Sequence, residues 1–287
     1  MKKALFLFPF FLCSQYLLAQ KALKIISYNV YNYFEAEQER KQRFISWATT
    51  QQADVIAYQE LVNINEQELA QLGKSIGHPF TALAKEKGYA VGISSKYPIE
   101  KVKKVIKGMH HGFMAVSIQD LNFIIVHLSP FSHEKRGEEI ATITDSLTRW
   151  SIAKNTIILG DMNSLAAADS LEYNRNGRLI PMLKSDERSK LSNARQGHLD
   201  YSVTDALLKK GFIDTWSRKD HAFDFSYPTL EFGPVPDSSK ERIDYIFISK
   251  DLKKKTSKSG ILKDPLTDHL SDHYPIRIII GPTTPLR

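Results

Sequence analysis

Eight short apolar stretches, rich in β-branched and aromatic residues, constrain the fold of this chain more than any other feature. Each one ends in polar or turn-forming residues, which is the pattern of a β-strand. Their apolar runs are nearly continuous, so we expect strands that are buried on both faces. The stretches lie at residues 23–31, 53–61, 89–95, 113–118, 122–128, 155–163, 242–249 and 274–280.

Amphipathic segments separate some of these strands. Apolar residues at helical spacing predict helices over residues 37–52, 134–152 and 201–212, the last ended by Gly211. Residues 116–125 fit a hairpin that turns between Gln119 and Asn122. Strands that alternate with helices and also form hairpins indicate an α/β fold with mixed sheets.

The length and composition fit one large domain. The 287 residues are 42% hydrophobic, and neither a repeat nor an interdomain linker is visible, so we assign residues 20–287 to one domain. Residues 164–200 are rich in Asp, Ser, Asn and Arg, and we expect an irregular segment there. An irregular segment of that length inside a compact domain is usually a functional or mobile loop.

The first nineteen residues have the layout of a secretory signal peptide. Lys2 and Lys3 precede an apolar run that ends at Cys13, and Leu17 and Ala19 precede the expected cut. A membrane anchor is disfavoured, because the run is shorter than the ~20 residues that a spanning helix needs. A lipid-modified Cys13 is also disfavoured, because the residues before it are large. We therefore expect a secreted or periplasmic protein with no transmembrane segment.

Charge and cysteine usage limit the chemistry. Cys13 is the only cysteine, so the mature chain has no disulfide, no thiol chemistry and no cysteine-based zinc site. The net charge of +7 becomes +5 without Lys2 and Lys3, and a lysine-rich run at residues 250–263 holds much of the excess. A basic surface favours anionic partners, although such runs are often only solvated loops.

Polar side chains stand where the apolar stretches end. Asp161 and Asn163 close one of them, two residues apart, so on an extended backbone they would point the same way. Each such residue alone is commonly a turn or cap residue. Together they suggest a site, because α/β proteins gather functional residues at strand ends. The others are Asn29, Glu60, His127, Arg242, Asp244, Asp272 and His273.

The residue types in this set match two kinds of ligand. Carboxylate and carboxamide oxygens suit Mg²⁺ or Mn²⁺. Imidazole and amide N–H groups suit phosphate oxygens. A carboxylate that activates water, beside a donor that holds a phosphoryl oxygen, is the arrangement that this set could build.

The ordered series of motifs resembles the endonuclease/exonuclease/phosphatase superfamily, which contains DNase I-like nucleases, inositol polyphosphate phosphatases and bacterial sphingomyelinases. The motifs are YNV, YQE, ISSKYPI, VHLSP, GDMN, RIDYIF and SDHYPI, and the likeness runs over residues 23–280. It implies a four-layer α/β sandwich of two mixed β-sheets, packed face to face with helices outside. It also implies Glu60 as the principal ligand of Mg²⁺ or Mn²⁺, with Asn29 and Asp272 close to the metal.

The same resemblance assigns catalytic roles. Asp161 would orient or deprotonate the attacking water, and Asn163 and His127 would donate hydrogen bonds to phosphate. His273 would also contact the phosphate, and Asp244 would fix its tautomer through the other ring nitrogen.

Some positions depart from the superfamily pattern or add to it. Tyr31 stands where some abasic-site nucleases carry an aspartate, which puts a second metal in doubt. His111, at the start of a strand, is the best further candidate for substrate binding. Arg136 fits either a phosphate clamp or a helix surface charge, and His110 and His133 are expected to be half-exposed loop residues.

We therefore expect a secreted, monomeric, Mg²⁺-dependent phosphoester hydrolase, and within that class a phosphodiesterase. A phosphomonoesterase acting on sugar or inositol phosphates and an extracellular nuclease are the alternatives, and a lipid headgroup is an open substrate. A binding protein that has lost catalysis is disfavoured, because every motif position holds a competent residue. The lysine run, placed next to the SDH motif, and the mixed charge of residues 164–200 favour a compact substrate over duplex DNA.

Overall fold

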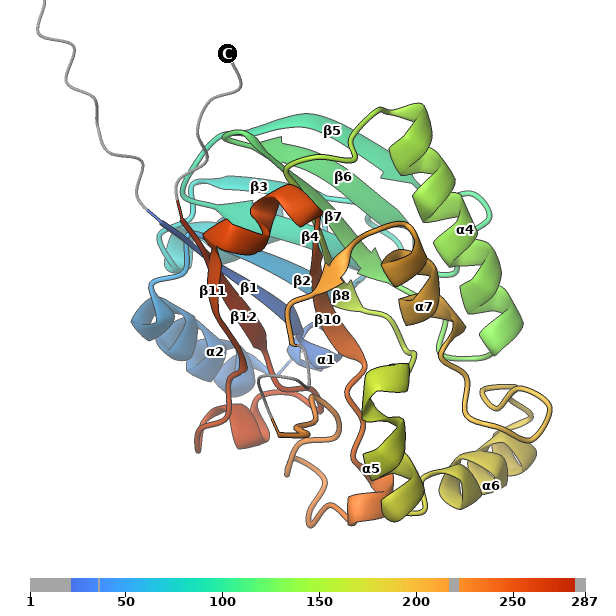
Figure 1. Ribbon diagram of the computed structural model, residues 1–287. Coiled ribbons are helices and arrows are strands. Elements are labelled where there is room, and N and C mark those ends of the chain that lie inside the picture. The colour runs from blue at the N-terminus through green and yellow to red at the C-terminus, as the bar shows by residue number, and fades with distance from the viewer. Residues whose placement is uncertain (1–21, 36, 217–221, 282–287) are drawn as a thin grey trace, which may run out of the picture.

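Two six-stranded sheets pack face to face in the computed structural model, and helices cover their outer faces (Figure 1). The structure describes residues 22–35, 37–216 and 222–281. The predicted signal peptide lies outside these residues. Within the described residues, no helix has the length and apolar character needed to cross a membrane. The four-layer α/β sandwich predicted from the sequence is confirmed.

The first sheet is mixed: β1 runs parallel to β2 and antiparallel to β12. Its strand order is β11-β12-β1-β2-β4-β3. The strands are β11 Thr256–Ile261, β12 Ile276–Ile280, β1 Leu23–Asn29, β2 Val55–Val62, β4 Tyr89–Ser95 and β3 Phe80–Leu83.

The second sheet repeats this design: β7 runs parallel to β8, and β8 runs antiparallel to β10. Its strand order is β5-β6-β7-β8-β10-β9. The strands are β5 Ile99–Val105, β6 Phe113–Ile118, β7 Leu121–His127, β8 Thr156–Asp161, β10 Asp244–Ile248 and β9 Ile213–Asp214. The predicted hairpin is confirmed by the pairing of Ile118 with Leu121.

Alternate residues of the central strands enter different apolar layers. In β1, Ile25 packs between the two sheets, while Ile26 packs against the helices of the first sheet. In β8, Ile157 and Leu159 lie between the sheets, and Ile158 faces the helices of the second sheet. Because successive side chains of a strand point to opposite faces, a continuous apolar run fills two cores at once.

Helices α2 and α3 belong to the first sheet, and α4 and α7 to the second. The three predicted helices are found as α2, α4 and α7, whereas α3 is new. Its capping box joins Asn65 and Glu68, a signal that the sequence carried. The helices are α1 Tyr31–Phe34, α2 Gln38–Gln51, α3 Glu66–Ser75, α4 His133–Arg149, α5 Ser170–Arg175, α6 Leu179–Ser189, α7 Ser202–Lys209, η1 Ala167–Asp169, η2 Asp237–Ser239, η3 Lys250–Lys255 and η4 Thr267–His269.

The irregular segment expected at residues 164–200 is largely helical, so that prediction was wrong. It contains η1, α5 and α6, which lie near the end of the sandwich where β8 finishes (Figure 1). Two apolar anchors explain the order: Tyr173 of α5 and Met182 of α6 are buried together with Leu165 and Ile243. Exposed apolar residues such as Leu171 and Ile180, together with the buried Asp169 and Asp186, break the apolar spacing that would have predicted these short helices.

Candidate active site

The strand pairing brings the predicted residues to one end of the sandwich. Asn29 is paired with Gln59 across the parallel strands β1 and β2, and His127 with Asp161 across β7 and β8. The antiparallel strand β10 begins at Asp244, directly opposite Asp161. Parallel strands end at the same edge, and an antiparallel neighbour begins there, so these polar ends converge.

A cavity of about 480 Å³ opens at this end. Its lining includes seven of the ten predicted site residues: Glu60, His111, His127, Asp161, Asn163, Asp272 and His273. Asn29 and Asp244 lie directly beneath them and are hydrogen-bonded to them. The tenth residue, Arg136, lies elsewhere.

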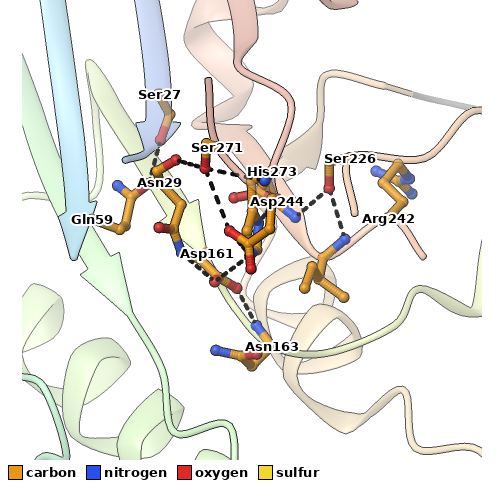
Figure 2. Close-up of polar contacts among 12 residues, drawn as sticks. Ser27, Asn29, Gln59, Asp161, Asn163, Ser226, Arg242, Asp244, Ser271 and His273 are labelled. Carbon is orange, nitrogen blue, oxygen red and sulfur yellow. Dashed lines mark hydrogen bonds and ion pairs between the residues drawn. The ribbon is translucent and has the colours of Figure 1, made fainter. Parts of the chain in front are cut away.

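The amide of Asn29 joins two of the carboxylates. Its Nδ2 donates to Oδ2 of Asp161 at 3.1 Å (Figure 2) and to Oε1 of Glu60, also at 3.1 Å, and its Oδ1 accepts the backbone N–H of Tyr31. In this arrangement Asn29 presents N–H groups, and it orients the carboxylates. The assignment of Asn29 as a direct metal ligand stays a prediction. It requires the side-chain amide to rotate so that Oδ1, and not Nδ2, faces the cavity.

Glu60 stands on a strained stretch of β2. The register with β4 shifts between Tyr58 and Leu61, and Glu60 has a φ of 61°, in the left-handed region. A bulge of this kind re-aims a side chain, and such backbone is retained where surrounding contacts over-determine it. The re-aimed carboxylate is held by Asn29 and by the backbone N–H of Asn32, which donates to Oε2 at 2.8 Å.

Helix α1 is an unusual element, because residues 31–35 all have positive φ and form a left-handed turn. Left-handed backbone costs about 1–2 kcal/mol for each residue with a Cβ. Burial of Phe34 against Phe44 and Tyr28 offsets part of this cost. The turn directs the backbone N–H groups of Tyr31 and Asn32 toward the side chains of Asn29 and Glu60. The strained backbone therefore helps to position these two site residues.

His273 and Asp244 form a buried dyad. Nδ1 of His273 donates to Oδ2 of Asp244 at 2.8 Å, which leaves Nε2 facing Asp161 at 3.7 Å and Asp272 at 4.0 Å. Burial opposes protonation of this ring, but Asp244, Asp272 and Asp161 together raise the pKa of His273 well above its ordinary value. The tautomer role that the resemblance gives to Asp244 matches this geometry.

The carboxylates of the site repel one another. Burial, with contributions from Asp244 and Glu60, raises the pKa of Asp161 to about 8, although His273 opposes the shift. Burial and Glu60 likewise raise the pKa of Asp272 to about 6, again against His273. A cation beside these oxygens would lower both pKa values, so the donor set fits a divalent metal.

One compact triplet could also hold a cation by itself. Ligand atoms of Asp161, Asp244 and His273 lie within 4.8 Å of one another. However, Nδ1 of His273 already donates to Asp244, and its raised pKa favours the protonated ring. A protonated imidazole cannot bind a metal. The triplet therefore fits a proton-handling group better than a metal site, and Glu60 and Asp272 offer further carboxylate oxygens in the same cavity.

The juxtaposition of Asp161 and Asn163 arises differently from the sequence expectation. Strand β8 ends at Asp161, and Asn163 has a left-handed φ of 46°, so the extended-backbone argument was wrong. The chain turns here, and the Asn163 backbone N–H donates to Oδ1 of Asp161 at 2.8 Å. The Asn163 side chain donates to the carbonyl of Leu128 at 3.0 Å and still lines the cavity.

A glycine makes the close strand packing at Asp161 feasible. Gly160 has a φ of 140°, and a Cβ at this position would lie 1.9 Å from the carbonyl oxygen of Val126. No side chain fits in that space. The glycine of the GDMN motif therefore serves to bring β7 and β8, and with them His127 and Asp161, close together.

His111 and His127 form a stacked pair on the cavity wall. Their ring centroids are 3.9 Å apart with an interplanar angle of 11°. Burial lowers the pKa of His111 to about 3, and burial together with His111 and His273 lowers the pKa of His127 well below its ordinary value. Nε2 of His127 lies 3.5 Å from Oδ2 of Asp161. Both rings are thus neutral near pH 7 and can each donate one N–H to an anion.

Two arginines lie outside the cavity. Arg136 is 2% exposed and donates to the carbonyl of Ser129 and to Oδ1 of Asn193, so it is neither a surface charge nor a clamp in the main cavity. Arg242 points away from the dyad (Figure 2) and pairs with Asp169 and Asp214. Arg136 therefore belongs to a hydrogen-bond network outside the main cavity, and Arg242 belongs to an ion-pair network there.

Several further residues of the cavity wall were not predicted from the sequence. Tyr227 packs its ring 4.9 Å from that of His273, and Nε of Arg178 donates to Glu241 at 2.7 Å. Asn32 and His110 also line the cavity. Most of these residues come from segments without strand periodicity, so only the position of Glu241, next to a predicted strand, was a usable signal.

Sequence comparison settles the family. The sequence model of the endonuclease/exonuclease/phosphatase family matches residues 26–273, which is most of the chain. The chain belongs to the endonuclease/exonuclease/phosphatase family. It is therefore a phosphoester hydrolase, with the cavity described above as its candidate active site. No curated protein sequence is significantly similar to it.

Solved structures share the fold of this family member. An AP endonuclease from Archaeoglobus fulgidus has a TM-score of 0.69 at 18% identity, covering 90% of this chain and 99% of its own. A 3′ phosphatase, NExo, from Neisseria, solved with a product DNA hairpin, has a TM-score of 0.66 at 18% identity, with 91% and 100% covered. A family protein from Bacteroides thetaiotaomicron has a TM-score of 0.59 at 16% identity, with 92% and 99% covered.

The histidine pair of this hydrolase predicts a loss of stability in acid. The unfolded chain takes up a proton on His111 below pH 6.5, whereas the native state does so only near pH 3, so stability falls as pH drops through this window. One such group contributes about 1.4 kcal/mol per pH unit. In EDTA, His111→Gln should therefore show a shallower decline between pH 6.5 and 4.5, measured by urea unfolding. Equal slopes for the two proteins would contradict the buried neutral imidazole, and their difference at pH 7.5 reports lost packing alone.

Proposed function

We propose that this family member is an exported Mg²⁺-dependent phosphodiesterase that acts on compact phosphoesters. The main observation in favour of a small substrate is the scarcity of basic side chains on the cavity wall. Among the described residues that line the cavity, Arg178 is the one lysine or arginine, and it is paired with Glu241. Polyanion binding needs basic side chains aligned along several phosphates, and such a row is missing from this part of the wall.

The position of the lysine-rich run also supports a compact substrate. The backbone N–H of Asn155 donates to Asp251 of η3, and that of Ser249 donates to the carbonyl of Thr156. Residues 250–255 therefore lie at the start of β8, about 17 Å along the strand from Asp161, at ~3.3 Å per residue. The expectation that the whole run lies next to the SDH motif was wrong, and its first half cannot guide a long substrate through the site.

Glu60 and Asp272 would hold the divalent metal, and Asp161 lines the same cavity. The metal would supply charge neutralisation at a phosphoryl oxygen. Its identity as Mg²⁺ rests on the all-oxygen donor set and on hard-ligand preference, which Mn²⁺ shares. If the protein were only a binding protein, chelation would change no turnover, whereas the proposed enzyme loses activity in EDTA and regains it with Mg²⁺.

Different side chains of the site would transfer protons and stabilise the developing negative charge. Asp161 is held by Asn29 and by the Asn163 N–H, with a raised affinity for protons, so it can orient a water and accept its proton. His273, kept protonated by its carboxylate neighbours, can donate from Nε2 to the oxygen on which charge develops. His127, His111 and Asn163 line the same cavity as neutral donors.

A substrate panel with a salt series tests the proposed size of the substrate. We expect kcat/KM on bis(p-nitrophenyl) phosphate to exceed that on plasmid DNA, RNA, sphingomyelin vesicles and p-nitrophenyl phosphate. Log kcat/KM should fall with log salt at a slope near that of one or two phosphate contacts, at about −0.9 per contact. A steep slope on DNA, with plasmid the best substrate, would favour an extracellular nuclease. Preference for p-nitrophenyl phosphate would favour a phosphomonoesterase.

Export is part of the proposal and rests on residues 1–19. The charged start, the short apolar run and the Leu17 to Ala19 segment support a signal peptide. Expression of the full chain in a bacterium, followed by mass spectrometry of the exported fraction, should find a mature chain that begins at residue 20. Recovery of the uncut chain from the cytoplasm alone would contradict export.

A further inference from the structure

A second, smaller cavity opens beside the active site, behind Asn163. This side pocket is bounded by Arg136, Met182, Asp186 and Asp200, and it shares Asn163 and Asn193 with the wall of the main cavity. Its volume of about 90 Å³ exceeds the roughly 30 Å³ that one water molecule occupies in the liquid. The pocket is therefore large enough for a polar fragment of a substrate whose phosphate lies in the main cavity.

Two buried charged residues of the side pocket each have one side-chain atom without a hydrogen-bond partner, and the buried hydroxyl of Ser164, which also lines the pocket, has none either. Arg136 is 2% exposed, and its Nε makes no hydrogen bond, although NH1 donates to Asn193 and to the carbonyl of Ser129. Asp186 is 8% exposed, and its Oδ1 is unpartnered, whereas Oδ2 accepts the backbone N–H groups of Asn193 and Ala194. A buried charged group with an unmade hydrogen bond is costly, so both atoms call for a ligand.

Asn193 ties the two unpartnered groups into one unit. Its Oδ1 accepts from Arg136 at 2.7 Å, and its backbone N–H donates to Asp186 at 2.8 Å. The residue also lines the main cavity. Arg136 and Asp186 are thus both hydrogen-bonded to one residue that also lines the main cavity.

The charges of the pocket exclude an ion as the occupant. Arg178 is paired with Glu241 and Asp200 with Arg195, which leaves the cation of Arg136 and the anion of Asp186. A second phosphate would meet Asp186, and an ammonium group would meet Arg136. The fitting occupant is neutral, and it both accepts a hydrogen bond and donates one. A hydroxyl group does both through one oxygen.

We propose that the side pocket binds a hydroxyl group on the alcohol portion of the substrate, between Nε of Arg136 and Oδ1 of Asp186. The substrate class is then a phosphoester of a polyol, such as glycerol, a sugar or an inositol. This inference rests on the proposed function for the position of the phosphate. In this proposal the helical segment of residues 167–189, which includes Asp186, selects substrates that have a hydroxyl group at this position.

The test compares two ligands that differ only in their hydroxyl groups and resist hydrolysis at the P–C bond. These are 2,3-dihydroxypropylphosphonate and propylphosphonate, titrated calorimetrically into the full protein with Mg²⁺. We expect the dihydroxy ligand to bind about 10- to 100-fold more tightly, as hydrogen bonds to charged groups allow. Asp186→Asn should reduce this ratio toward one and leave the Kd of propylphosphonate unchanged. Glu187→Gln, an exposed neighbour on α6 with the same loss of charge, should keep the full ratio.

The wild-type comparison alone can overturn the proposal. Equal Kd values for the two phosphonates would mean that the pocket holds water only, and binding of neither would remove the phosphate position on which the proposal rests. A ratio that survives in Asp186→Asn would also overturn it. If Asp186→Asn does not fold, Arg136→Lys, which keeps the charge but removes the Nε donor, should show the reduced ratio in its place. Hydrolysis of bis(p-nitrophenyl) phosphate by the wild type decides the proposed function separately, because that ester carries no hydroxyl group.

Discussion

Glu60→Gln is expected to reduce turnover of bis(p-nitrophenyl) phosphate by about a thousandfold or more, equal to about 4 kcal/mol of transition-state stabilisation. The substitution removes the anionic ligand proposed for the metal and keeps the size of the side chain. It also removes a charge that raises the pKa of Asp272 and Asp161. That relief opposes the loss of one hydrogen bond from Asn29 or Asn32, so the thermal midpoint in EDTA should hold or rise slightly.

The response to Mg²⁺ gives the same variant a second readout. A ligand at 100 times its Kd stabilises the native state by about 2.7 kcal/mol, and Glu60→Gln should abolish this gain. Glu66→Gln is the matched control, because Glu66 lies at the exposed start of α3 beside Lys104. It should keep both turnover and the Mg²⁺ shift. Retained turnover of Glu60→Gln at saturating Mg²⁺ would show that the ligand assignment is wrong.

The strands that sequence reasoning found and those that it missed differ in one physical property. All eight predicted strands are interior strands, and the four missed strands, β3, β5, β9 and β11, are the sheet edges. Interior strands bury both faces and so carry continuous apolar runs. Edge strands are short or charged instead: β5 has five exposed positions that include Lys101 and Lys103. Such charges disfavour pairing of the open edge with another strand. They also interrupt the apolar run by which a strand is recognised in the sequence.

The site divides along a similar line. Residues at the ends of interior strands, such as Glu60, Asp161 and Asp244, could be predicted because topology alone brings strand ends together. Arg136 was ambiguous in the sequence, since a helix position fixes neither its burial nor its direction. Tyr227 and Arg178 lie in long connections, whose placement depends on tertiary packing that no local pattern encodes. Asn163 does line the cavity, but it reaches it through a left-handed turn and not through the extended backbone expected from the sequence.

The dyad supplies the other large effect. His273→Ala should lower kcat by roughly 100- to 10,000-fold, the range for a positioned proton donor. Asp244→Asn should lower it by at least tenfold, because it removes the carboxylate that receives Nδ1–H and holds the ring protonated. In Asp244→Asn the pKa of His273 falls, so the alkaline limb of the pH–rate profile should move to lower pH. Asp251→Asn, on η3 at the far end of β8, is the matched control and should change neither quantity.

The double variant decides whether the two residues act as one unit. If Asp244 contributes only by orienting and charging His273, removing it after His273 is gone should cost nothing more. The double variant should then resemble His273→Ala in kcat, and the coupling free energy should equal the whole effect of Asp244→Asn. Losses in log kcat that simply add would break the dyad. They would mean that Asp244 acts on Asp161, its neighbour across β8 and β10, independently of the histidine.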